Sequence, residues 1–125
     1  MNVKIMGADS SATSKSGNNW LDVLQVSSLP AKLHKLTVSP LAGMAADVYV
    51  WIFDLAAGSG ASAAPVIVRF VPAGLADSWD FGPDGSIFRA GIYLALSSVA
   101  PTDATTTTSA SGNNKVILKA DYRPL

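Results

Sequence analysis

The chain has 125 residues, of which 49% are hydrophobic and only 14% are charged, so it fits one domain and is too apolar to be intrinsically disordered. Nine Lys and Arg balance nine acidic residues, which gives a formal net charge of zero. Without a basic block the chain lacks the electrostatic footprint of a nucleic-acid groove, and a neutral chain is equally unsuited to a membrane surface.

The kind of charged residue is informative as well. All nine acidic residues are Asp and none is Glu. Asp favours turns and caps, whereas Glu favours helix interiors, so this usage predicts an all-β protein. The low charge also favours a surface that is partly covered by partners, with a homo-oligomer among the expected arrangements.

The chain contains no Cys. This excludes disulfides, thiolate catalysis and Cys-based zinc sites. The first six residues lack the apolar core of a signal peptide, and no apolar run approaches membrane-spanning length. We therefore expect the chain to be made in the cytoplasm and to remain there, or to become part of an assembly that forms there.

The first nineteen residues differ from the rest. Val3 and Ile5 alternate with Asn2 and Lys4, which predicts a short edge strand or an arm laid along another surface. Residues 7–19 are polar and have the composition of a flexible linker. We therefore divide the chain into an arm and tether (1–19) and one β-sandwich domain (20–125).

Two strands are expected next, at residues 20–26 and 31–38. In the second, Leu36 and Val38 share a face with Lys32 and His34. This imperfect alternation predicts an edge or rim position in the sheet.

Residues 48–53 form the most informative strand. Val48, Val50 and Ile52 lie on one face, and Tyr49, Trp51 and Phe53 on the other. A strand that is apolar on both faces is either central in a sheet covered on both sides, or its aromatic face is an interface.

Further strands are expected at 66–71, 79–81, 92–97 and 115–122. Between them, residues 82–85 (Gly-Pro-Asp-Gly) give the sharpest turn signal of the chain. About eight short strands with frequent turns predict an antiparallel β-sandwich of jelly-roll type. The expected core residues are Ile52, Val68, Phe70, Ile92, Leu94 and Leu118.

No catalytic set emerges from the sequence. His34 is the single histidine; Ser39 and Ser10 are conceivable nucleophiles, but the strained Gly-x-Ser-x-Gly elbow is missing. Asp77, Asp80 and Asp84 do not have the spacing of a calcium loop, so we expect Asp80 to bond to backbone or to Arg89. The expectation is a protein without enzymatic activity, cofactor or metal.

Aromatic residues could serve three purposes. Tyr49, Trp51, Trp79 and Tyr93 suit a core, an interface between subunits, or a platform that stacks on sugars. A core explains them most simply. The candidate interface residues are Val3, Ile5, Tyr49, Trp51 and Trp79.

Residues 53–102 contain the phrases Phe-Asp-Leu (53–55), Ala-Pro-Val-Ile (64–67), Val-Pro-Ala-Gly (71–74), Asp-Phe-Gly (80–82) and Gly-Ile-Tyr-Leu-Ala-Leu-Ser-Ser (91–98). In these phrases the segment resembles small structural proteins of tailed-bacteriophage virions. The closing Ala-Asp-Tyr-Arg at 120–123 also fits the terminal strand of these proteins.

The resemblance implies a β-sandwich virion protein that assembles in the host cytoplasm. Its leading form is a capsid decoration, or cement, protein that binds the major capsid protein or other virion proteins and strengthens the shell. Many copies then multiply modest individual affinities. The alternative is a tail or fibre component, including a module that binds carbohydrate on the host surface.

Overall fold

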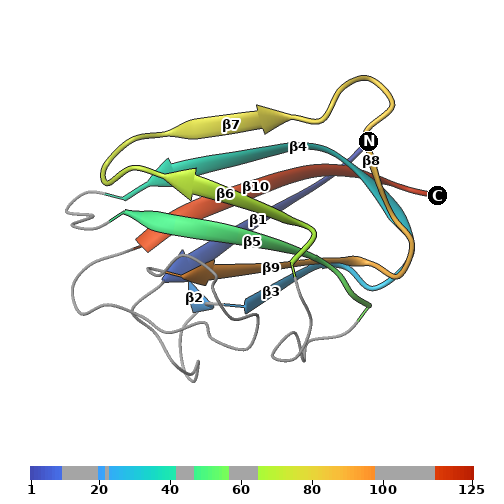
Figure 1. Cartoon of the computed structure of the whole chain (residues 1–125), viewed down its shortest axis with the longest axis horizontal. Helices are drawn as coiled ribbons and strands as arrows, with labels where there is room; N and C mark the ends of the chain where they lie inside the picture. Colours follow the sequence, from blue (N-terminus) through green and yellow to red (C-terminus); the bar gives the residue numbers. More distant parts are fainter. Residues whose placement is uncertain (10–19, 22, 42–46, 57–64, 98–114) are drawn as a thin grey trace.

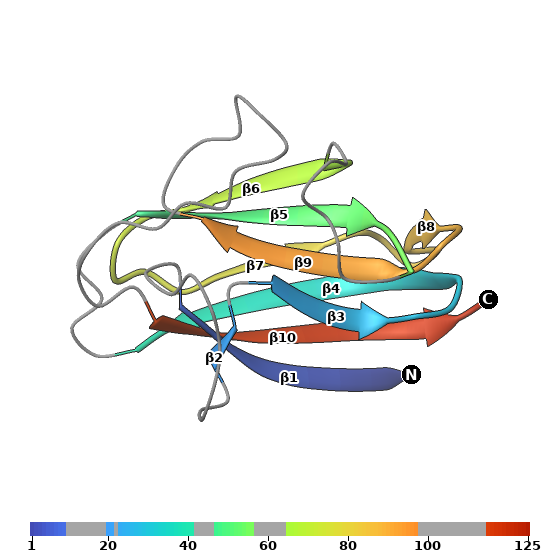
Figure 2. The ribbon, with the colours of Figure 1, turned by 90° about the horizontal axis from the view of Figure 1, so that it is seen from below.

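The computed structural model of the chain describes residues 1–9, 20, 21, 23–41, 47–56, 65–97 and 115–125. In these residues it has ten strands and no helix, arranged as two sheets packed face to face (Figures 1 and 2). The prediction of an all-β antiparallel sandwich is confirmed. The finer expectation of jelly-roll topology stays a prediction.

The first sheet has the order β2-β1-β10-β4-β7, and β8 pairs with β4 beside β7. Its pairs are antiparallel except the short parallel pair of β1 with β2. Its strands are β1 (Asn2–Asp9), β2 (Trp20–Leu21), β4 (Ala31–Pro40), β7 (Asp77–Asp80), β8 (Ser86–Phe88) and β10 (Lys115–Pro124).

The second sheet has the order β3-β9-β5-β6, and all its pairs are antiparallel. Its edge strands are β3 and β6, so β5 is an inner strand. Its strands are β3 (Val23–Ser27), β5 (Val48–Asp54), β6 (Ile67–Val71) and β9 (Ile92–Ser97).

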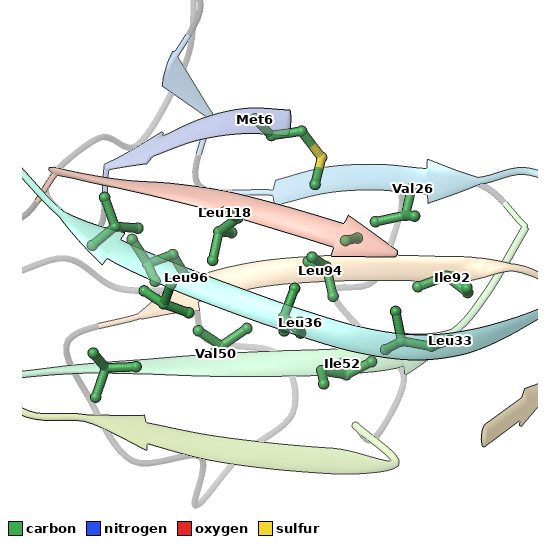
Figure 3. Close-up of a cluster of buried hydrophobic side chains, with 14 of the residues drawn as sticks. Met6, Val26, Leu33, Leu36, Val50, Ile52, Ile92, Leu94, Leu96 and Leu118 are labelled. Atoms are coloured by element: carbon green, nitrogen blue, oxygen red, sulfur yellow. The ribbon is translucent and has the colours of Figure 1, made fainter. Parts of the chain in front are cut away.

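The main core lies between the two sheets (Figure 3). Ile52, Ile92, Leu94 and Leu118 are fully buried there, which confirms four of the six predicted core residues. Period-two alternation explains their placement, because every second side chain of β5, β9 and β10 points to the same face of its sheet.

Val68 and Phe70 do not belong to this core, and that prediction is wrong. They are 38% and 46% exposed. Strand β6 turns Ile67, Arg69 and Val71 inward instead. The charge of Arg69 suggested the opposite orientation, but its guanidinium lies against aromatic rings near the sandwich edge rather than in solvent.

Strand β4 is not at a rim. It pairs with β10 on one side and with β7 and β8 on the other. Its pairing with β10 shifts between Asp121 and Tyr122, and His34 is the extra residue on β4. This β-bulge accounts for the imperfect alternation, because it lets Leu33 and Leu36 face the same core although they are three residues apart.

Strand β1 is part of the sandwich. It pairs with β10 at all eight of its residues, from Asn2 opposite Tyr122 to Asp9 opposite Lys115, and it buries Met6 in the main core. Within the single chain the predicted arm therefore docks on its own domain, and residues 7–9 are strand rather than tether. Residues 10–19 of the predicted tether lie outside the described part.

Candidate interaction surfaces

The outer face of the second sheet carries a second apolar cluster. It consists of Trp51, Phe53, Tyr93 and Ala95, which are buried, with Tyr49 and Leu55 half-buried beside them. Strand β5 is thus apolar and buried on both faces, as its sequence predicts. Trp51 is 1% exposed, so its ring does not reach the surface of the chain.

Towards the free edge of the same sheet the apolar surface becomes exposed. Val66, Val68 and Phe70, named here the β6 strip, alternate along β6 and the residue before it. Phe70 lies opposite Tyr49, with ring centroids 5.3 Å apart, and Val68 lies opposite Trp51. In the described part of the chain no strand pairs with the outer edge of β6. Because alternate residues of a strand share a face, these three exposed side chains form one apolar row.

The five residues chosen from sequence fall in three places. Tyr49 and Trp51 lie on the outer face of the second sheet, where they are the cross-strand partners of Phe70 and Val68 in the β6 strip. Trp79 lies on β7 and is half-buried against the main core, near Arg69. Val3 and Ile5 are exposed on β1.

Sequence reasoning missed Val68 and Phe70 as surface residues. Their alternation with Arg69 separates the two faces of β6, but the charge of Arg69 suggested that its own face is outward, which is wrong. Their cross-strand partners could have indicated it, because the aromatic face of β5 continues onto β6 only through these two residues.

A different surface feature lies on the outer face of the first sheet, beside the bulge of β4. It is an open hollow of about 630 Å³. Its charged residues come from three neighbouring strands in register, since Lys35 of β4 lies opposite Asp121 of β10 and opposite Asp80 of β7. The hollow is lined by Met1, His34, Lys35, Asp80, Gly82, Pro83 and Asp121.

Backbone hydrogen bonds fix the turn beside this hollow. The N–H of Phe81 donates to the carbonyl of His34 (2.9 Å), and the N–H of Gly85 donates to the carbonyl of Gly82 (3.1 Å). Asp80 Oδ1 accepts from the N–H of Gly82 at 2.8 Å, so the predicted bond of Asp80 to backbone is confirmed. The predicted turn at 82–85 is confirmed as well.

The imidazole of His34 lies directly under this turn. A Cβ at Gly85 would be 3.1 Å from Cε1 of the ring, and Gly85 has a φ of +70°. Both the space and the backbone conformation therefore favour glycine at this position. His34 Nε2 and Asp121 Oδ1 are buried atoms without a hydrogen-bond partner.

The residues considered for catalysis do not come together. Ser39 lies on β4 in register with Ile117, away from the bulge at His34, and Ser10 lies outside the described residues. Among the described residues no group of three His, Cys, Asp or Glu side chains could hold a metal ion. Asp77, Asp80 and Asp84 therefore do not form a calcium site in this structure.

One carboxylate has a structural role that the sequence did not indicate. Asp54, at the end of β5, accepts hydrogen bonds from the N–H groups of Arg89 (3.1 Å), Ala90 (2.8 Å) and Gly91 (3.3 Å). Partial burial alone would raise the pKa of Asp54. The three backbone donors and the positive charge of Arg89 outweigh this effect, so its pKa lies below the usual value.

Comparison with known proteins gives no relative: no family model, curated protein or solved structure matches the chain. In the part of the chain that the structure describes, no helix is long and apolar enough to cross a membrane.

Proposed function

We propose that this chain is a structural protein of a tailed-bacteriophage virion that binds the assembled capsid as a decoration protein. The exposed β6 strip is the observation that carries the contact, and the sequence phrases at 53–102 support the virion assignment. Apolar surface of this kind, continuous with a buried cluster, is typical of a site covered by a protein partner.

The surroundings of the strip favour it over the other exposed apolar pair. Val3 and Ile5 lie in register with Asp121 and Lys119, so charged residues border both of them. Val68 and Phe70 lie in register with Trp51 and Tyr49. A partner that covers the β6 strip therefore has to desolvate fewer charged side chains than one that covers Val3 and Ile5.

The small size of the strip fits a repeated partner surface. Stable pairwise interfaces use roughly 20–30 residues on each side, many more than the strip offers. A contact of this size is weak for a single copy. On a shell that repeats the same surface many times, weak contacts still give high occupancy and strengthen the seams between subunits.

Cryo-electron microscopy of purified particles that contain the chain tests this function. We expect many copies distributed over the shell. A few copies at the tail would overturn the decoration role in favour of the alternative, a tail or fibre component. Trp51 and Tyr93 are buried, so a sugar platform built on these two rings has little support.

A rebinding assay with two matched variants tests the surface. Val68→Lys and Ile5→Lys each place one new charge at an exposed apolar site. The assay uses particles from which the chain has been removed and measures how much added protein binds to them. Because burying an unpaired charge is costly, Val68→Lys should lower the amount bound by at least about tenfold. Ile5→Lys should bind like the unchanged protein. The reverse result would move the contact to the surface of Val3 and Ile5.

A further inference from the structure

Arg69 lies on the same strand as the β6 strip, between Val68 and Phe70, and points to the other face of the sheet. We propose that the partner surface which covers the β6 strip carries an Asp or Glu side chain whose carboxylate pairs with Arg69. This inference rests on the function proposed above and names the chemistry of the partner. The strip supplies the apolar part of the contact, and Arg69 selects an acidic residue beside it.

The first argument is that the charge of Arg69 has no counter-ion in the described part of the chain. The side chain is half-buried, and its guanidinium makes no ion pair or hydrogen bond with the described residues. Its Nε is enclosed, but the two Nη nitrogens are accessible to a partner. A partly desolvated cation without a counter-ion is unfavourable, so a carboxylate that pairs with it stabilises the complex.

The two acidic residues of β7 do not neutralise this charge. Asp80 lines the hollow on the outer face of the first sheet, and its Oδ1 accepts a backbone N–H of the turn that follows. Asp77 begins β7, and its Oδ1 accepts from the N–H of Ser78 at 2.8 Å. Neither carboxylate forms an ion pair with Arg69.

The second argument is that the guanidinium is held in place before a partner arrives. Its carbon lies 5.8 Å from the centroid of the Trp79 ring and 6.0 Å from that of the Phe81 ring, and both rings pack against the main core. Contact with the rings restricts the side chain, so less conformational freedom is lost on binding. The N–H groups of a guanidinium form a planar fork that fits the two oxygens of a carboxylate.

The third argument is access. Strands β6 and β7 are the last strands of their sheets, and in the described residues no strand pairs with the outer edge of either. A surface that covers Val68 and Phe70 and extends past the edge of β6 therefore brings a side chain within reach of Arg69. This contact needs no backbone pairing with β6.

The surroundings of Arg69 select a single carboxylate rather than a nucleic acid. Its half-buried neighbours Ile67, Trp79 and Phe81 are apolar or aromatic, and β6 and β7 contain no second Lys or Arg. Nucleic acids bind through several cations that neutralise neighbouring phosphates, whereas one guanidinium balances one carboxylate.

The same rebinding assay tests the acidic partner with two matched variants. Arg69→Met and Arg123→Met each replace one Arg by a neutral side chain, and Arg123 is exposed on β10 of the first sheet. Arg69→Met should lower the amount bound by at least about tenfold, because the carboxylate is then covered without its cation. Arg123→Met should bind like the unchanged protein. Thermal unfolding of both variants checks that the fold is kept.

Chemical neutralisation of the particle gives a test that needs no variant. Carbodiimide activation followed by glycinamide converts exposed Asp and Glu carboxylates of the emptied particles into neutral amides, and particles treated with glycinamide alone are the control. The unchanged protein should bind to the amidated particles as weakly as Arg69→Met binds to the control particles. Binding of Arg69→Met should not fall further on amidation.

Three results would overturn the proposal. If Arg69→Met binds normally while Val68→Lys does not, the acidic partner is wrong and the capsid contact through the strip stands. If Arg69→Met and Arg123→Met lose binding equally, the effect is one of overall charge. If amidated particles bind the unchanged protein normally, the group that pairs with Arg69 is not a carboxylate. Normal binding of both Arg69→Met and Val68→Lys would instead refute the β6 contact itself, and this inference with it.

Discussion

The guanidinium carbon of Arg69 lies 5.8 Å from the centroid of the Trp79 ring. This contact joins β6 of the second sheet to β7 of the first sheet. At the opposite side of the sandwich, Lys4 of β1 donates a hydrogen bond from Nζ to the carbonyl of Gln25 in β3 (2.7 Å). On both sides, a cation of one sheet therefore contacts the other sheet, and Arg69 does so from the edge strand β6. Inward charges on edge strands oppose pairing with another sheet, so we expect the β6 strip to act through its face rather than its backbone edge.

The Arg69–Trp79 contact should be measurable as a coupling free energy. A double-mutant cycle with Arg69→Met and Trp79→Leu, followed by chemical denaturation, should give about 0.5–1 kcal/mol. Lys4→Met with Trp79→Leu is the control cycle and should be additive, because the two residues lie at opposite sides of the sandwich. Equal coupling in the two cycles would show that the contact is not specific.

The core assignment makes a second prediction. Leu94 is fully buried, so Leu94→Ala should lower the free energy of unfolding by about 2–5 kcal/mol through lost contacts and a residual cavity. Val68→Ala should cost less than about 1 kcal/mol, because Val68 is 38% exposed. Similar losses at both positions, measured by urea denaturation, would contradict the register of β6.

Gly91 is required for close approach of two backbone segments. A Cβ there would lie 2.5 Å from the carbonyl oxygen of Ser27 and 2.6 Å from that of Leu55. Both are backbone atoms and cannot rotate away, so Gly91→Ala should cost about 1–3 kcal/mol. Ala90→Ser, at the exposed neighbouring position, should stay within about 0.5 kcal/mol. Thermal unfolding of the two variants makes the comparison, and an unaffected Gly91→Ala protein would contradict this packing.

Asp54 predicts a pH dependence of stability. Its pKa is lower in the folded state than in the unfolded chain, so the unfolded state binds more protons as the pH falls. The stabilisation is fully present above the unfolded value of about 4, and it is lost as the pH falls through the folded value. Asp54→Asn should therefore cost about 1 kcal/mol at neutral pH, after solvent screening, and progressively less in acid. A difference between the two proteins that does not change with pH would contradict the role of the charge.

Sequence alone predicted the strands well but not their neighbours. Alternation and turn residues located β4, β5, β6, β9 and β10, because these signals are local. The predicted orientation of β6 is wrong because the Arg69 side chain points inward, against Trp79 and Phe81. This contact depends on β7 and the residue after it, in the other sheet, and local sequence does not reveal it. The sequence did not predict the hollow beside His34 for a similar reason, because the bulge is visible only when β4 is aligned with β10.

The N-terminal strand gives the last prediction, which decides between an arm and an ordinary first strand. Strand β1 pairs with β10 along its whole length and buries Met6. Removing residues 2–9 should therefore lower the free energy of unfolding by more than about 2 kcal/mol, since burial of a Met side chain alone contributes about that much. A Val3→Ser/Ile5→Ser double variant is the control. It changes only exposed side chains of β1 and should stay within about 1 kcal/mol of the unchanged protein. Full stability after truncation, with loss of particle binding, would mean instead that β1 pairs with a neighbouring subunit.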